Sequence, residues 1–237
     1  GFDAATEARF LGYVRFMVQA LHITAPVVLH LDHGLSVEHV YQAIDAGYTS
    51  VMFDGSKLPI EENVALTDEV VRYAHQHHVS VEAEVGSVGG NENGLINGIR
   101  YASVTDAVKM AATGIDALAA ALGSVHGDYV GRPNLNFERM AAIAAATKLP
   151  LVLHGASGIP DDQIQQAIQT GTAKININTE VNTVWTAAIT KAVQAKRSGH
   201  DPQPILLAGK KAIAQLVETK MKAFHILGKS KRSVTFE

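Results

Sequence analysis

The chain has 237 residues, of which 47% are hydrophobic and 18% charged, and its formal net charge at pH 7 is −3. A chain of this composition can bury a core as one domain, and without Lys- or Arg-rich runs it is unlike a nucleic-acid-binding protein. It contains no cysteine, which excludes disulfides and thiolate metal sites and leaves His, Asp and Glu as the strong metal ligands. No apolar run is long enough to span a membrane, so we expect a cytoplasmic protein without membrane or nucleic-acid partners.

Short apolar runs alternate with longer amphipathic segments, the pattern of parallel strands joined by crossover helices. In chain order we expect strands at Val27–Leu31, Ser50–Phe53, Val79–Glu84, Ala117–Leu122, Leu151–His154 and Ala173–Asn176. We expect helices at Ala4–Leu21, Val37–Ala46, Glu61–His77, Val104–Thr113, Phe137–Thr147 and Asp161–Thr170. Ser36 is placed to cap the second helix and Gly47 to end it.

The repeating pattern predicts an α/β fold, a (β/α)8 TIM barrel, as a single domain over residues 1–237. Six strands are visible where a closed barrel has eight, so we expect that the sequence lacks the first two βα units. Two C-terminal helices, Thr179–Lys196 and Pro204–Phe224, are expected within residues 179–225. The segment Val85–Tyr101 holds five glycines and is long for an ordinary connection, so we interpret it as a mobile active-site loop.

Polar residues follow every expected strand, at the end where a parallel barrel gathers its functional groups. The six strand ends carry Asp32-His33-Gly34, Asp54-Gly55-Ser56, Glu82-Ala83-Glu84, Gly123-Ser124-Val125-His126-Gly127, His154-Gly155-Ala156-Ser157-Gly158 and Asn176-Ile177-Asn178-Thr179. A single histidine among the eleven is more often structural than a ligand, but His33, His126 and His154 share this placement. Together they could supply three nitrogen ligands to a zinc and leave its fourth position open.

Other histidines fit ordinary roles. His75, His77 and His78 lie at a helix end and are expected to be exposed, while His30 is expected to point into the barrel as a structural group.

The glycines after the last two strands have two interpretations. They could merely turn the chain, or, with the two helices that follow, they could offer backbone N–H groups to a phosphate. Two such segments side by side match the common phosphate site of this fold.

These segments together resemble the class II fructose-bisphosphate and tagatose-bisphosphate aldolases. The matching segments are residues 29–34, 81–86, 123–127, 153–158 and 174–180. The resemblance implies that His33, His126 and His154 hold a catalytic zinc. It also implies that Asp32 exchanges the proton of the hydroxyl at the cleaved bond, and that Glu92 is a mobile acid/base.

The resemblance further implies that Asp54 and Glu84 bind a second, exchangeable divalent or monovalent cation. It implies substrate contacts from Gly127, Gly155, Ala156, Ser157, Asn176, Ile177, Asn178 and Thr179. The implied assembly is a homodimer or homotetramer. From the residues alone, Asp32 could instead only orient a metal-bound histidine.

The implied reaction is the reversible cleavage of fructose 1,6-bisphosphate to dihydroxyacetone phosphate and glyceraldehyde 3-phosphate. A divalent metal suits this chemistry because it stabilises the enediolate that carbon–carbon cleavage leaves behind. Three alternatives stay open: cleavage of tagatose 1,6-bisphosphate, a Schiff-base aldolase with Lys174 as the nucleophile, and a barrel that binds a sugar phosphate without turnover.

Overall fold

The computed structural model describes residues 4–92, 95–195 and 201–229. The helices within these ranges are α1 (Ala4–Ala20), α2 (Val37–Ala46), α3 (Ile60–Gln76), α4 (Val104–Ala111), α5 (Phe137–Thr147), α6 (Asp161–Gln169), α7 (Thr179–Gln194) and α8 (Gln203–Ala223). The strands are β1 (His30–Gly34), β2 (Ser50–Phe53), β3 (Ser80–Val85), β4 (Gly89–Glu92), β5 (Leu95–Asn97), β6 (Ala117–Ala120), β7 (Val125–His126), β8 (Leu151–Leu153) and β9 (Thr172–Ile175).

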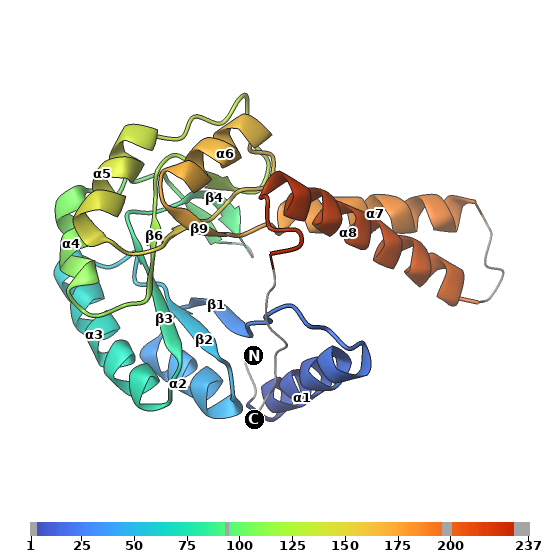
Figure 1. Cartoon of the computed structure of the whole chain (residues 1–237), viewed down its shortest axis with the longest axis horizontal. Helices are drawn as coiled ribbons and strands as arrows, with labels where there is room; N and C mark the ends of the chain where they lie inside the picture. The colour runs from blue at the N-terminus through green and yellow to red at the C-terminus, as the bar shows by residue number, and fades with distance from the viewer. Residues whose placement is uncertain (1–3, 93–94, 196–200, 230–237) are drawn as a thin grey trace.

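Six strands form one parallel sheet in the order β1-β2-β3-β6-β8-β9. The sheet curls, and helices α2 to α6 cover its convex face (Figure 1). Neighbouring strands pair in register, for example Val51 with Leu31 on one side and with Val81 on the other. The six predicted parallel strands and the α/β class are confirmed.

The helices bury an apolar stripe against this sheet, as α2 illustrates. Its buried residues Val40, Ala43 and Ile44 recur at the spacing of one helix face. The Ser36 hydroxyl accepts the backbone N–H three residues further on, and Gly47 ends the helix with a φ of 103°. Both predicted caps are confirmed, and each satisfies backbone groups that a helix end leaves unpaired.

The start of one predicted strand needs correction, and the predicted glycine-rich loop contains strands. The first strand begins at His30 rather than Val27, and Val28 is 63% exposed, so the apolar residues before His30 do not pack as a strand interior. The glycine-rich segment contains two short strands, since β4 pairs with β5 in antiparallel orientation and also with β7 in parallel orientation. Its mobility stays a prediction. A Cβ on Gly90 would collide with the His126 carbonyl oxygen, so this glycine permits close strand pairing.

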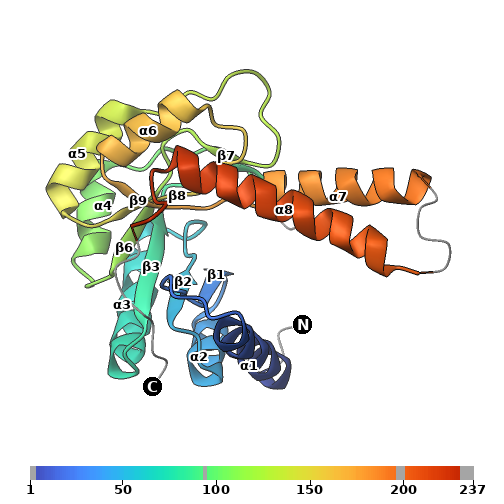
Figure 2. The ribbon, with the colours of Figure 1, turned by 45° about the vertical axis from the view of Figure 1, so that its right-hand side comes forward.

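The predicted C-terminal helices are confirmed as α7 and α8, which pack on each other and project from the body of the molecule (Figures 1 and 2). A Cβ on Gly209 would lie 2.6 Å from Trp185 Nε1, so the two helices approach closely at this glycine. None of the described helices has both the length and the apolar content needed to cross a membrane.

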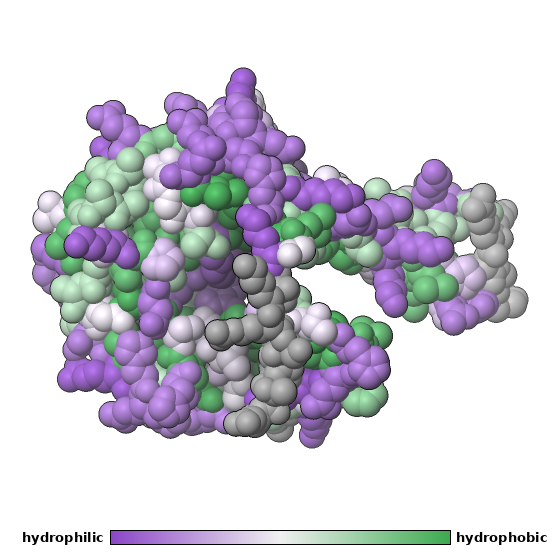
Figure 3. All heavy atoms as spheres, in the orientation of Figure 1, coloured by the Kyte–Doolittle hydropathy of each residue, from purple (hydrophilic) through white to green (hydrophobic). Residues whose placement is uncertain are grey.

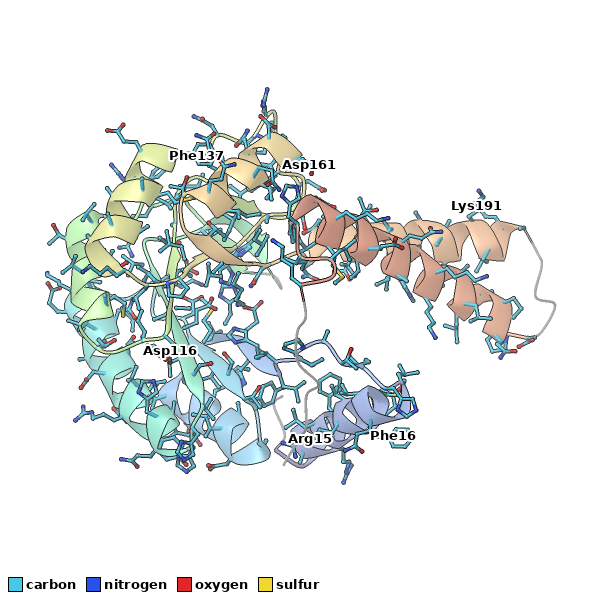
Figure 4. All side chains as sticks on the ribbon, viewed as in Figure 1. Arg15, Phe16, Asp116, Phe137, Asp161 and Lys191 are labelled. Atoms are coloured by element: carbon cyan, nitrogen blue, oxygen red, sulfur yellow. The ribbon has the colours of Figure 1, made fainter. Side chains whose placement is uncertain are left out.

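Apolar side chains are also exposed on α1, where Figure 3 shows hydrophobic surface. Phe10, Tyr13 and Phe16 are 53%, 61% and 61% exposed. Phe16 projects from the helix away from the sheet (Figure 4). The buried face of α1 is small: among its described side chains, Leu11 and Val18 are buried.

Asp116, labelled in Figure 4, directly precedes β6 and links it to β3. Its Oδ2 accepts the backbone N–H of Val81 at 2.7 Å and lies 3.0 Å from His75 Nε2. Its own N–H donates to the Val81 carbonyl at 2.8 Å. This double contact fixes the register of the two strands at the end of the sheet opposite the histidines.

Replacing Asp116 by Ala should lower the free energy of unfolding by about 1–3 kcal/mol, because the N–H of the buried Val81 loses its acceptor. Urea unfolding followed by circular dichroism measures this loss. Asp116→Asn keeps an acceptor oxygen and should lose less. An unchanged stability of Asp116→Ala would show that water replaces the carboxylate without cost.

Candidate active site

Three histidines meet at the carboxyl ends of the strands. His33 lies in β1, His126 ends β7 and His154 directly follows β8. Ligand nitrogens of all three lie within 4.8 Å of one another. Their ring centroids are 4.7 to 5.9 Å apart. His33 has a φ of 52°, a left-handed conformation that side-chain-bearing residues rarely adopt and that marks a constrained position.

Two of these rings are oriented by carboxylates. His33 Nδ1 donates to Asp54 Oδ2 at 2.7 Å, and His154 Nε2 donates to Glu82 Oε1 at 2.8 Å. The opposite nitrogens, His33 Nε2 and His154 Nδ1, then face each other at 3.1 Å. In neutral rings both of these nitrogens carry lone pairs, which repel unless a cation lies between them. The residues therefore fit a divalent metal with nitrogen ligands, which bind zinc at about 2 Å.

Glu82 is buried at 2% exposure and orients His154, a role that was not predicted from the sequence. It also accepts from Lys174 Nζ at 2.7 Å. Burial alone would raise the pKa of Glu82, but the hydrogen bond from His154 and the charge of Lys174 outweigh it and lower the pKa to about 2. A signal was present in the sequence: Glu82 and Glu84 are two apart in a strand, so they share one face.

Lys174 and His30 complete this buried network. Lys174 Nζ lies 3.2 Å from His30 Nε2, and His30 Nδ1 contacts Ser50 Oγ at 2.8 Å. Burial and the charge of Lys174 lower the pKa of His30 to about 4, so His30 is neutral at pH 7. The His30 side chain is only 14% exposed, which agrees with the interior structural role predicted for it. An ammonium group paired with a buried carboxylate is poorly prepared to act as a nucleophile.

A second group of ligand atoms, from His33, Asp54 and Glu84, again lies within 4.8 Å of one another. Because His33 Nδ1 donates to Asp54, the two carboxylates are the groups available to a cation here. Glu84 is 2% exposed, and its Oε2 has no hydrogen-bond partner among the described residues. Burial and the neighbouring Asp54 raise the pKa of Glu84 to about 7. Burial would also raise the pKa of Asp54, but hydrogen bonds from His33 and Ser56 outweigh it and lower the pKa to about 2. A cation here would satisfy the unpaired oxygen.

A cavity of about 1270 Å³ opens beside the histidines. Predicted site residues in its lining are Asp32, His126, Gly127, His154, Gly155, Ser157, Asn176, Ile177, Asn178 and Thr179. Asp32 is exposed to this space, and its Oδ1 accepts from Asn176 Nδ2 at 3.2 Å. Ala156 is fully buried in the core, so only its backbone is available to the site. Glu92 ends β4, and its side chain lies outside the described residues.

The cavity wall also contains the N-terminus of α7. Ser157 Oγ accepts the backbone N–H of Glu180 at 3.2 Å, and the Glu180 carboxylate in turn accepts the N–H of Gly158 at 2.6 Å. These contacts hold the β8–α6 connection against the first turn of α7. Backbone N–H groups and the positive end of the helix dipole favour an anion at this position.

A curled parallel sheet with polar side chains gathered at the carboxyl ends of its strands is the arrangement of α/β-barrel enzymes. Residues 3–229 match the family described as "Fructose-bisphosphate aldolase class-II". The chain is 54% identical over 215 residues to the 6-phospho-5-dehydro-2-deoxy-D-gluconate aldolase of Bacillus subtilis, covering 90% of this chain and 74% of that protein.

It is 49% identical over 220 residues to a fructose-bisphosphate aldolase of Staphylococcus aureus, covering 92% of this chain and 77% of that protein. The crystal structure of the YdjI aldolase from Escherichia coli K12 superposes with a TM-score of 0.80 at 35% identity, covering 94% of this chain and 78% of that one. The chain therefore belongs to the class II fructose-bisphosphate aldolase family and is an aldolase, a carbon–carbon lyase. The predicted family is confirmed.

Replacing Glu82 by Gln should weaken zinc binding about 10- to 100-fold, because His154 loses the ionised acceptor that fixes its ring. Competition with a chromophoric chelator measures the dissociation constant. Glu69→Gln is a matched control, since Glu69 accepts a hydrogen bond from Tyr41 on an exposed helix face. Wild-type zinc affinity in Glu82→Gln would contradict the orienting role.

The raised pKa of Glu84 predicts a pH-dependent stability of the metal-free protein. The folded state keeps this proton up to about pH 7, whereas the unfolded chain releases it near 4.5. The stabilisation is therefore complete below pH 4.5 and is lost as the pH rises through 7. From pH 8 to pH 5 the wild type should gain about 2–3 kcal/mol relative to Glu84→Gln. Urea unfolding of both proteins in the presence of EDTA measures this difference. Parallel pH profiles of stability for the wild type and Glu84→Gln would contradict the prediction.

Proposed function

We propose that the protein catalyses the reversible, zinc-dependent aldol cleavage of fructose 1,6-bisphosphate to dihydroxyacetone phosphate and glyceraldehyde 3-phosphate. The observation that carries this proposal is the position of the carboxylate-oriented histidines beside a cavity whose wall offers an anion site. Metal ligands, a carboxylate base and a phosphate position are the three parts that this reaction requires.

Zinc held by His33, His126 and His154 would supply Lewis-acid stabilisation of the charge that develops beside the ketone. Asp32 is the proposed base. In cleavage it takes the proton from the hydroxyl whose carbon becomes the aldehyde, and in condensation it returns that proton. Its exposure to the cavity supports this role over the alternative of orienting a histidine, because Asp54 and Glu82 already orient two of the rings.

The phosphate of the triose half would bind at the N-terminus of α7. Gly127, Gly155 and Ser157 border the cavity on one side, and Asn178 and Thr179 open the helix. Asn176 also lines the cavity and keeps Asp32 in place through its amide. Glu92 is the proposed group that exchanges the proton on the triose carbon, and Asp54 with Glu84 the proposed second cation position.

A second candidate substrate is 6-phospho-5-dehydro-2-deoxy-D-gluconate, the molecule in the name of relatives that are 52% to 54% identical to this chain. Both candidates carry a ketone next to a phosphorylated carbon, so both fit the same metal and phosphate positions. They differ in the other half, which ends in a phosphate in one molecule and a carboxylate in the other. Tagatose 1,6-bisphosphate is a third candidate that differs from fructose 1,6-bisphosphate at one carbon.

Cleavage of the three candidates, followed by coupled detection of dihydroxyacetone phosphate, tests the proposal. Activity should disappear with EDTA and return with zinc, and the ratio of kcat/KM values identifies the substrate. Asp32→Asn should lower kcat by about 10²- to 10⁴-fold with little change in zinc affinity. Activity that resists EDTA together with borohydride trapping at Lys174 would establish the Schiff-base alternative. Phosphate binding without any turnover would establish a non-catalytic barrel.

A further inference from the structure

Tyr129, for which the sequence predicted no role, connects two of the histidine-bearing segments. Its hydroxyl accepts the backbone N–H of Val125 at 3.0 Å and donates to the Gly155 carbonyl at 2.8 Å. Val125 directly precedes His126, and Gly155 directly follows His154. One hydroxyl group therefore spans the backbones that carry two of the three nitrogen ligands.

The two backbones lie in close contact at this point. Gly155 has a φ of 63°, and a Cβ on it would collide with the Val125 carbonyl oxygen. On its other side β7 pairs with β4, where Gly90 leaves no room for a Cβ next to His126. Since β7 has only two residues, its ladder supplies few hydrogen bonds, and contacts from outside the sheet contribute a large share of its positioning.

Tyr129 also lies near the proposed phosphate position. Together with Gly127, Ser157 and Thr179 its side chain lines a second cavity, of about 400 Å³, which shares these three residues with the main cavity. Its Cδ2 lies 3.5 Å from the position of a Cβ on Gly158, so the ring packs against the same connection whose N–H groups face α7.

We propose that Tyr129 is a positioning residue that sets the separation of the His126–Gly127 and His154–Ser157 segments, and thereby both the metal affinity and the phosphate contacts. This inference rests on the proposed function only for the identity of the two bound species, zinc and phosphate. Tyr129 reaches neither the histidine nitrogens nor Asp32 through any hydrogen bond seen in the described residues. Its loss should therefore weaken binding and leave the chemical step nearly intact.

Tyr129→Phe removes the hydroxyl and keeps the ring. Zinc affinity is measured by chelator competition on the full chain, and inorganic phosphate affinity by calorimetry on the zinc-loaded protein. Both dissociation constants should rise about 10-fold, as for other groups that orient metal ligands, with kcat within about twofold of wild type and KM increased. Tyr73→Phe is the matched control, because it removes a hydroxyl that donates to Asp45 at 2.6 Å on the surface of α2 and α3.

Unchanged zinc and phosphate affinities in Tyr129→Phe would overturn the proposal. A rise in only one of the two constants would overturn the shared positioning, and equal losses in both tyrosine variants would show a general effect on stability. Neither binding measurement requires turnover. A wild-type protein that binds zinc and phosphate but cleaves none of the candidates would refute the proposed function and leave this inference open to the same test.

Discussion

The rest of the site depends on the buried carboxylate of Glu82. A charge removed from water must be paired and hydrogen-bonded, and Glu82 meets this requirement with Lys174 from β9 and His154 after β8. His30 from β1 lies 3.7 Å away. One residue of β3 thus draws together side chains from both edges of the sheet, and the contact that satisfies its charge also fixes the ring of a proposed metal ligand.

Three neighbouring carboxylates differ in ionisation because their partners differ. Glu82 and Asp54 each accept a histidine N–H, and both have a pKa of about 2 despite burial. Glu84 has no such donor, and its pKa rises to about 7. Two of the carboxylates are therefore permanently available to orient histidines, whereas the third gains its charge near neutral pH, where a cation would stabilise it.

The two halves of the proposed chemistry are built from different elements. The proposed metal ligands lie in or directly after strands, while the proposed anion site is formed by the first turn of α7 and the glycine-containing connections beside it. Tyr129 links these parts through the backbone rather than through the ligands. Such a division lets a family keep its metal chemistry while the groups around the far end of the substrate vary.

Apart from the start of the first strand, the residue pattern was enough to predict the parallel strands. It also predicted that His33, His126, His154 and Asp32 meet, because parallel strands bring their carboxyl ends together whatever lies between them. It did not determine which of Glu82 and Glu84 would orient a histidine, since both point to the same face. That choice depends on contacts such as Lys174 with Glu82, 92 residues apart. The β4–β5 hairpin was likewise invisible in the sequence, because its glycines serve a close approach to β7 that only the tertiary structure creates.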